Sequence, residues 1–504
     1  MPTSKVRCLY EKNKGRFMKN IFSLILLLVF FLFTSYAESY EINNKQIGFG
    51  PLNAIKMNNS KSIFQSSSEA QSFFYQGNDL FTLGRYSEAL DYYNRAIGVD
   101  EEYAEAYYMK GVALIYHSQY MQAALSLDKA LELKPDYAEA LNAKGIALHY
   151  LERYNEAIEF YDRALELKPD FTSALIGKGV ALDVLGRYEE EIECYDKALS
   201  INPALKEAYN FKGYALGKLE QYEDALLNLD KALEVDPKYA QAYYNKGDVL
   251  FELERYEEAL ECFDRALLIY PNFNEALAKK GFTLNKLRHY DEALTSLDSA
   301  LILDPSNKET LYNKGVALYN LGYYMDALND FNTAISIDSE YIDALNGASS
   351  ALIELDYYEE ALGNINKVLA FDPNNFDAWF NKGVVLSFNG KLTEALQCFD
   401  NALIVNPYSE IAWRYKGNIL FYLQRYEEAI EAYDKALAIE PASEMLLFYK
   451  AEALRALGRF DEAIASYGRL VELNGSCAEV AQRSIDEIRG EIRGYPPVYL
   501  NQLY

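Results

Sequence analysis

The feature that most constrains this chain is a spacing of 34 residues that never varies. From Ala70 to Cys477 one pattern returns twelve times without insertion or deletion. It is marked by a column of small residues, namely Gly77, Gly111, Gly145, Gly179, Gly213, Gly247, Gly281, Gly315, Gly383 and Gly417. A proline column follows it in register, namely Pro135, Pro169, Pro203, Pro237, Pro271, Pro305, Pro373, Pro407 and Pro441. Such an array predicts stacked units with interfaces between neighbours, without one central core.

The spacing also sets the predicted domain boundaries. Residues 1–37 form a basic leader with an apolar run, 38–69 a flexible polar linker, 478–493 a capping helix and 494–504 a tail. The twelve predicted repeats are 70–103, 104–137, 138–171, 172–205, 206–239, 240–273, 274–307, 308–341, 342–375, 376–409, 410–443 and 444–477.

Each unit has the pattern of two short helices. In 240–273, apolar or small residues recur three and four apart over 241–253, at Tyr243, Gly247, Leu250 and Leu253. A second helix over 257–270 carries Ala259, Phe263 and Ala266 on one face, and Pro271 ends it. Glycine stands at the intervening turn in five units, where a left-handed residue ends a helix at little cost. We expect Gly247 to face Ala259 across the pair, so that the two backbones approach closely.

These residues resemble the tetratricopeptide repeat, a family whose helix–turn–helix unit also spans 34 residues. The Lys-Gly pair at 246–247 is similar to a variant found in repeat proteins of methanogenic archaea. The resemblance implies an all-α, right-handed superhelical solenoid of twelve repeats with a capping helix. It also implies that the first helices line a concave groove that binds other proteins or peptides.

Carried onto this sequence, that groove predicts a set of candidate binding residues. Bulky apolar residues and short polar ones alternate along one inward column, and asparagine recurs in the next. We expect the asparagine amides to bond a peptide backbone and the aromatic rings to accept side chains. The alternative is that both only pack between helices. The candidates are Tyr108, Asn142, Asn210, Tyr244, Asn245, Tyr312, Asn313, Asn346, Phe380, Asn381, Arg414 and Asn418. Relatives that grip a C-terminal carboxylate need an asparagine where Tyr449 stands, so that clamp is absent.

Three other features have structural consequences. Lysine precedes the small-residue column in ten units, and we expect its ammonium group to reach an acid of a second helix, as in the Asp264 column. Glu191 replaces alanine in the close-contact column, which is unfavourable if the carboxylate is buried and unpaired. The unit 342–375 lacks both the lysine and the glycine and has Val368 for alanine, so we expect a weak joint there.

The N-terminal residues predict export. Six lysines and arginines precede the apolar run 21–37, and acids follow it, which places the repeats outside the cytoplasm. Two outcomes remain open: cleavage of a signal peptide near Ala37, or a membrane anchor over 21–37. Met1 and Met18 are alternative starts. Contact with the membrane is expected only through this segment, if it is uncleaved.

Charge and motifs exclude several functions. The formal net charge is −26, so no basic stripe is available for nucleic acid. The three histidines and five cysteines have no metal-ligand or disulfide spacing, and no phosphate-binding or nucleophile motif occurs. We therefore expect no cofactor, no metal and no catalysis. The main hypothesis is a scaffold for protein–protein interaction, and the alternatives are an accessory subunit for an envelope enzyme, such as a protein glycosyltransferase acting in trans, and a rigid spacer without ligand.

Overall fold

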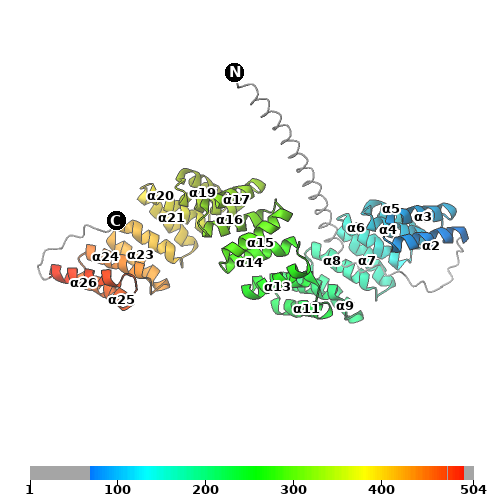
Figure 1. Ribbon diagram of the computed structural model, residues 1–504, viewed down its shortest axis with the longest axis horizontal. Coiled ribbons are helices and arrows are strands. Elements are labelled where there is room, and N and C mark those ends of the chain that lie inside the picture. Colours follow the sequence, from blue (N-terminus) through cyan, green and yellow to red (C-terminus); the bar gives the residue numbers. More distant parts are fainter. Residues whose placement is uncertain (1–67, 474, 493–504) are drawn as a thin grey trace, which may run out of the picture. The chain divides into compact units, whose positions relative to one another are not determined.

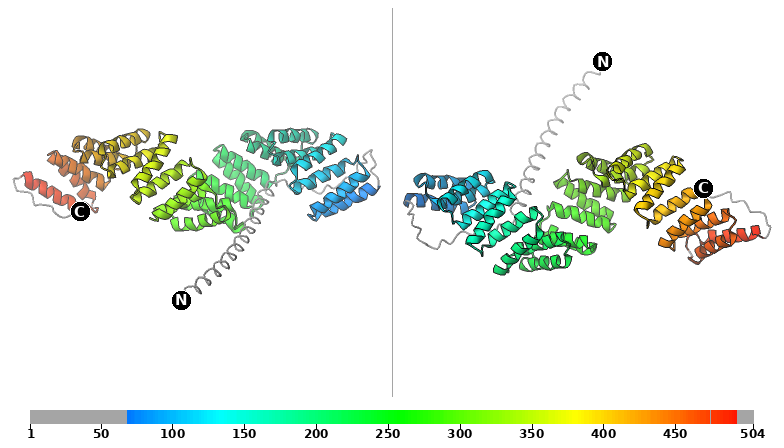
Figure 2. Two further views of the ribbon diagram at one scale, coloured as in Figure 1. Left: turned by 90° about the horizontal axis from the view of Figure 1, so that it is seen from above. Right: turned by 180° about the vertical axis from the view of Figure 1, so that it is seen from behind.

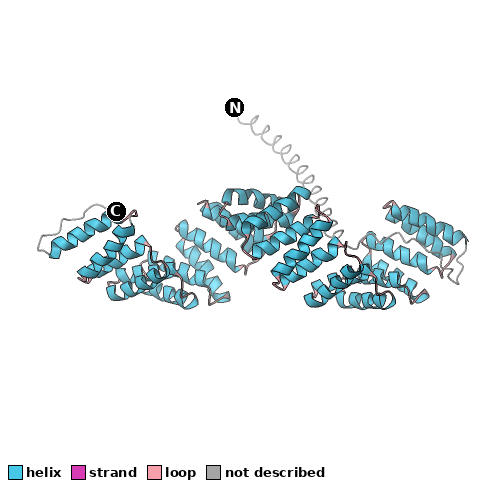
Figure 3. Cartoon of the chain, turned by 90° about the horizontal axis from the view of Figure 1, so that it is seen from below, coloured by secondary structure: helices cyan, strands magenta, loops and turns pink. Residues whose placement is uncertain are grey.

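The chain folds into helix pairs whose bounds recur with the period of the sequence. The computed structural model describes residues 68–473 and 475–492 (Figure 1). The predicted leader, the tail and most of the linker lie outside this range. Every regular element within it is an α-helix and none is a strand (Figure 3). No helix in the described range combines the length and apolar character needed to cross a membrane.

The described residues fall into two compact units that meet in sequence between Leu287 and Arg288. In the first unit, first helices of 13 residues (15 in α2) alternate with second helices of 14. Its helices are α2 (Ser68–Thr82), α3 (Tyr86–Val99), α4 (Ala104–Tyr116), α5 (Tyr120–Leu133), α6 (Ala138–Tyr150), α7 (Tyr154–Leu167), α8 (Thr172–Val184), α9 (Tyr188–Ile201), α10 (Lys206–Lys218), α11 (Tyr222–Val235), α12 (Ala240–Glu252), α13 (Tyr256–Ile269) and α14 (Asn274–Lys286).

The second unit continues the alternation and ends with one additional helix. Its helices are α15 (Tyr290–Leu303), α16 (Lys308–Asn320), α17 (Tyr324–Ile337), α18 (Ile342–Glu354), α19 (Tyr358–Phe371), α20 (Phe376–Phe388), α21 (Leu392–Val405), α22 (Glu410–Tyr422), α23 (Tyr426–Ile439), α24 (Glu444–Ala456), α25 (Phe460–Leu473) and α26 (Ala478–Ile492). Within each unit, every second helix packs against the first helix of the next pair (Figure 2). This stacking confirms the predicted solenoid.

The turn inside each repeat is closed by one residue in the left-handed conformation. The five predicted turn glycines all have positive φ, between 67° and 83°. The same column in the other seven repeats holds residues with side chains, which nevertheless adopt φ of 56° to 62°, namely Ser118, Glu152, Glu220, Glu254, Arg288, Asp356 and Gln424. The repeat geometry therefore fixes this conformation, whichever residue is present.

The small-residue column makes room for a large side chain of the second helix. A β-carbon added to Gly247 would lie 2.7 Å from the ring of Phe263. Phe263 and not the predicted Ala259 is thus the nearest neighbour. The same close approach, between 2.5 and 2.7 Å, occurs at Gly111, Gly145, Gly179, Gly213, Gly315, Gly383 and Gly417. Gly281 is buried in α14. In these repeats the glycine lets the large side chain of the second helix pack directly against the first helix.

Eight of the ten lysines form the predicted ion pair, and each pair joins two successive repeats, whereas Lys382 donates to Asn366 Oδ1. Lys280 Nζ lies 2.7 Å from Asp264 Oδ1, and Lys178 Nζ lies 2.6 Å from Asp162 Oδ1. The other pairs of this kind are Lys144–Asp128, Lys212–Asp196, Lys246–Asp230, Lys314–Asp298, Lys416–Asp400 and Lys450–Asp434. All of these aspartates remain about half exposed, so each pair contributes roughly 0–1 kcal/mol.

The unusual repeats keep a closed interior. In 342–375, Ala348, Ser349 and Val368 are all fully buried, and the Ser349 hydroxyl donates to the Leu345 carbonyl at 2.7 Å. Glu191 is 1 % exposed, so its carboxyl group stays inside the pair and does not turn outward.

The last helix, α26, covers the open end of the second unit. Its residues Ala481, Ile485 and Ile488 are buried in one apolar cluster with residues of α24 and α25. This agrees with the predicted capping helix.

Candidate functional site

The aromatic residues predicted to line a groove pack inside their own repeats. Tyr108 is 3 % exposed, and its ring lies 4.9 Å from that of Tyr137, the last residue of the repeat. Tyr244 makes the same contact with Phe273, with ring centroids 5.1 Å apart. Burial raises the pKa of both tyrosines well above the usual range. These rings are parts of the helix packing that are at most partly open to solvent.

Tyr312 and Phe380, in the second unit, are half-buried. Tyr312 contacts Tyr341 at 5.6 Å and Phe331 at 5.8 Å between ring centroids. In the repeat of Phe380 the last residue is Ser409, which has no ring. The Phe380 ring lies instead 5.2 Å from the ring of Tyr415 in the next first helix.

The predicted asparagines of the first unit connect successive first helices. Asn245 Nδ2 donates to Asn210 Oδ1 at 2.9 Å, which links α12 to α10. Asn142 Nδ2 donates to Ser173 Oγ at 3.3 Å, which links α6 to α8. Asn142 and Asn210 are fully buried and Asn245 is 5 % exposed. Their amides set the register between repeats, and direct contact with a ligand remains a prediction.

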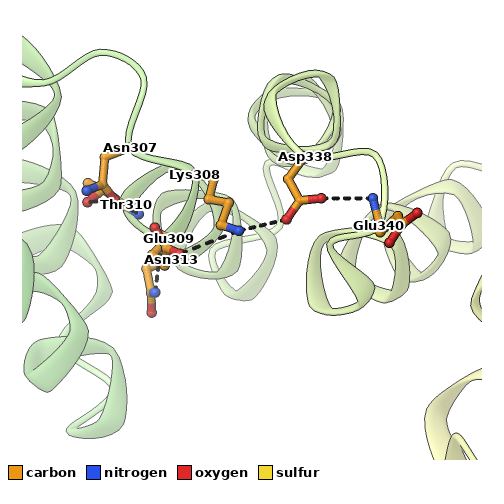
Figure 4. Close-up of polar contacts among 7 residues, drawn as sticks. All are labelled: Asn307, Lys308, Glu309, Thr310, Asn313, Asp338 and Glu340. Carbon is orange, nitrogen blue, oxygen red and sulfur yellow. Dashed lines mark hydrogen bonds and ion pairs between the residues drawn. The ribbon is translucent and has the colours of Figure 1, made fainter. Parts of the chain in front are cut away.

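The asparagines of the second unit also bond within the protein. Asn346 donates to Asn375 Oδ1 at 3.1 Å, and Asn381 donates to Ser350 Oγ at 3.2 Å. Asn313 Nδ2 donates to the Glu309 carbonyl one turn earlier at 2.9 Å (Figure 4).

Arg414 and Asn418 are likewise engaged. Arg414 Nε lies 3.2 Å from Glu410 Oε1 on the same helix, and Nη1 lies 3.5 Å from the sulfur of Met445. Asn418 accepts a hydrogen bond of 2.9 Å from the hydroxyl of Tyr433. Both side chains therefore contact other residues of the protein.

On the first helices, side chains at the two ends reach solvent. Their second and thirteenth residues are eleven apart, about 20° from each other around the helix, so both lie on one side. We call the side chains at these positions the first-helix face. In the second unit this face exposes Phe388 (65 %), Tyr422 (72 %), Ile411 (38 %) and Met445 (48 %).

These residues were not predicted from the sequence, although a signal was present. The thirteenth position is polar in five successive repeats, from Lys218 to Glu354, so Phe388 and Tyr422 depart from the repeats before them. Tyr116 and Val184 occupy the same position in the first unit and are 40 % and 52 % exposed.

At the thirteenth position, Phe388 and Tyr116 each stack on the tyrosine that begins the preceding second helix, whereas Tyr422 follows a second helix that begins with Leu392. Phe388 lies 5.5 Å from Tyr358 at an interplanar angle of 13°. Tyr116 stacks on Tyr86 at 5.1 Å in the first unit. One face of the Phe388 and Tyr116 rings is therefore fixed by the protein, and aromatic side chains are enriched where polypeptides bind.

The described residues include no group of three or more histidine, cysteine or acidic side chains placed to hold a metal ion. Cys194, Cys262 and Cys398 are buried free thiols, and burial raises the pKa of each to about 11. Such thiols are poor nucleophiles near neutral pH.

Comparison with known families identifies the repeat. Family models described as tetratricopeptide repeat match residues 108–170, 150–205, 212–273, 284–342, 364–397, 411–443 and 446–474. A model described as TPR repeat matches residues 77–117. Together these matches span most of the chain, which therefore belongs to the tetratricopeptide repeat family. No curated protein matches it.

Several solved structures are similar to this chain. The Cut9–Hcn1 hetero-tetramer of the APC/C has 14 % identity over 83 % of this chain and 97 % of that chain, with a TM-score of 0.47. Yeast Tom70 has 18 % identity, and the match covers 84 % of this chain and 96 % of the Tom70 chain, with a TM-score of 0.40. YrrB, described as a TPR protein with an unusual peptide-binding site, has 28 % identity. The match covers 37 % of this chain and 95 % of the YrrB chain, with a TM-score of 0.32.

Proposed function

We propose that this chain is a non-catalytic scaffold that binds other polypeptides on its first-helix face. The observation that carries the proposal is the exposure of Phe388, Tyr422, Ile411 and Met445 at equivalent positions of successive first helices. Large apolar side chains gathered on one exposed face are typical of sites of protein association. Binding spread over several repeats makes the contribution of each residue modest.

The proposal includes a place outside the cytoplasm. It rests on the basic leader and the apolar run 21–37, with the repeats either anchored by that run or released by cleavage near Ala37. N-terminal sequencing of the protein purified from its native host distinguishes the two: a start at residue 38 supports cleavage, and a start at Met1 or Met18 supports an anchor.

Site-specific photocrosslinking in the native host tests the binding face. Benzoylphenylalanine replaces Phe388 or Tyr422 on the first helices, and the matched controls carry it at Ile404 or Leu268 on second helices, which are 77 % and 75 % exposed. We expect polypeptide adducts from the first pair and few from the controls. Equal yields at all four positions, or none at 388 and 422, would contradict the proposal and favour a spacer without ligand.

A further inference from the structure

The second unit carries two carboxylates on its first-helix face that have no cationic partner. Asp343 is the second residue of α18 and Asp377 the second residue of α20, and both are exposed. Neither has an ion pair with any residue that the structure describes. A carboxylate in a first turn also stabilises the helix dipole, so position alone does not indicate a ligand.

Repeats of the first unit show how the same position is neutralised elsewhere. Glu105 and Glu139 stand at the second position there, and lysines after the second helix reach them, with Lys134 Nζ 3.5 Å from Glu105 and Lys168 Nζ 3.7 Å from Glu139. The place of these lysines is taken by Asp372 in the repeat of Asp343 and by Asn406 in the repeat of Asp377.

One repeat earlier, a cation is present but is already bound. Lys308 Nζ lies 2.6 Å from Asp338 Oδ2 and 3.9 Å from Glu309 Oε1 (Figure 4). It neutralises the neighbouring carboxylates of its own repeat. In the second unit, Asp343 and Asp377, which we call the acidic row, are thus the second-position carboxylates without an ion pair among the described residues.

The two aspartates are close enough to interact electrostatically with each other and with Tyr312 of α16. Although Asp377 reaches solvent, the surrounding helices remove enough water to raise its pKa, and repulsion by Asp343 raises it further. Burial raises the pKa of Tyr312 to about 12, with smaller contributions from Asp343 and Asp377. Two carboxylates beside an aromatic ring are the groups that attract a guanidinium or ammonium ion.

A buried amide between the two aspartates also has an unmet acceptor. Asn346 lies one turn after Asp343 on α18, and its Nδ2 bonds Asn375, which caps the helix that carries Asp377. Asn346 is 9 % exposed, and its Oδ1 has no donor among the described residues. This oxygen is itself buried, so Asn346 joins α18 to the start of α20 from inside the protein.

The acidic row continues into an apolar one. The second residues of α22 and α24, Ile411 and Met445, are exposed and hydrophobic. Directly packed helices are roughly 8–10 Å apart, which is a lower limit for successive first helices, and an extended chain advances about 3.3 Å per residue. One repeat therefore corresponds to at least about three residues of an extended ligand.

We infer that the first-helix face of the second unit docks an extended polypeptide segment. The segment places arginine or lysine at Asp343 and again at Asp377, and apolar residues at Ile411 and Met445, with about three ligand residues from one repeat to the next. This inference rests on the proposed function and names the chemistry of the partner. The occupant carries two basic residues followed by two apolar ones along one strand, and its basic residues complement a chain of net charge −26.

Fluorescence anisotropy with the full-length chain tests the inference. The probes are labelled peptides in which two arginines are followed by two leucines, each three residues from the next, made in both chain directions. One counterpart carries glutamate for both arginines, and another carries serine for both leucines. We expect an arginine–leucine peptide to bind in one or both directions, with affinity falling as salt rises, and the glutamate peptide to bind at least tenfold more weakly.

Matched variants locate the site. Asp343→Asn combined with Asp377→Asn is expected to weaken arginine–leucine binding about fivefold at low salt and to flatten its salt dependence. Glu105→Gln combined with Glu139→Gln changes the same position in the first unit and is expected to leave binding unchanged. Circular dichroism of each variant confirms that the helices remain.

The possible failures are distinguishable. If arginine and glutamate peptides bind alike, or the double aspartate variant binds like the parent, the basic partner is wrong while docking on this face stands. If neither arginine–leucine peptide binds, the inference fails; adducts at Phe388 and Tyr422 in the crosslinking experiment would still support the broader function.

Discussion

The hydroxyl group of Tyr433, on α23, donates a hydrogen bond of 2.9 Å to Oδ1 of Asn418, on α22. Tyr93 makes the same bond to Asn78 in the first repeat. Tyr161 occupies the equivalent position, but Ile146 stands where the asparagine would be, and the Tyr161 hydroxyl is buried without a partner in the described structure. The residue of the first helix at the position of Asn418 thus decides whether the buried tyrosine hydroxyl has a hydrogen-bond acceptor.

This difference predicts opposite effects of one substitution. Tyr161→Phe removes an unsatisfied buried hydroxyl and should raise the free energy of unfolding by about 1 kcal/mol. Tyr433→Phe removes one partner of a hydrogen bond and should lower it by about 1 kcal/mol. Urea denaturation followed by circular dichroism measures both, and a loss of stability in Tyr161→Phe as large as in Tyr433→Phe would contradict the assignment.

Glu191 makes stability depend on pH. Burial and then the nearby Asp183 raise its pKa from 4.5 to about 9, while Tyr195 opposes the shift slightly. The folded protein binds the Glu191 proton more tightly than the unfolded chain does. The stabilisation that this proton contributes to the folded protein is therefore fully present below pH 4.5 and is lost as pH rises toward 9. Each unit of pH in that window corresponds to about 1.4 kcal/mol.

Glu191→Ala, which restores the residue of the other eleven repeats, should therefore stabilise the protein more at pH 8 than at pH 5. The measurement is the urea midpoint at the two pH values. Glu193→Ala on the same helix is the control, since Glu193 is exposed and its removal should shift neither midpoint much. An equal gain from Glu191→Ala at both pH values would mean that the carboxyl group does not change its protonation on unfolding.

The left-handed turn residue predicts a second kind of stabilisation. Glu254 has φ of 57°, and a side chain in this conformation costs roughly 1–2 kcal/mol relative to glycine. Glu254→Gly should stabilise by about 1 kcal/mol, whereas Gly322→Ala, at φ of 83°, should destabilise by a similar amount. Thermal unfolding of the two variants against the parent checks the signs, and stabilisation by Gly322→Ala would refute the argument.

The sequence predicted the fold because each structural requirement recurs every 34 residues. Gly247, the turn at Glu254 and Pro271 each appear in a column, so helix bounds followed to within one or two residues. The candidate site was harder to predict, because exposure depends on residues of the neighbouring repeat.

Tyr108 shows the difficulty. It lies on the side of its helix expected to face a groove, yet Tyr137, almost a full repeat later in sequence, covers its ring. Asn245 is hidden by its bond to Asn210, 35 residues earlier. The pairing of an aromatic fifth residue with an aromatic last residue, as in Tyr244 with Phe273, was visible in the sequence and signals packing.

The two residues at 246 and 247 separate the contributions of charge and packing to the repeat. Lys246 Nζ lies 2.5 Å from Asp230 Oδ1, but Asp230 is about half exposed, so Lys246→Met should change the free energy of unfolding by less than about 1 kcal/mol. Gly247→Ala places a β-carbon 2.7 Å from the buried Phe263 ring, which has no free space to move into, so it should destabilise by about 1–3 kcal/mol. Urea denaturation at low and high salt measures both. If packing dominates, Gly247→Ala has the larger effect on the free energy of unfolding, and that effect does not depend on salt. A larger effect of Lys246→Met that vanishes in high salt would instead show that ion pairs hold successive repeats together.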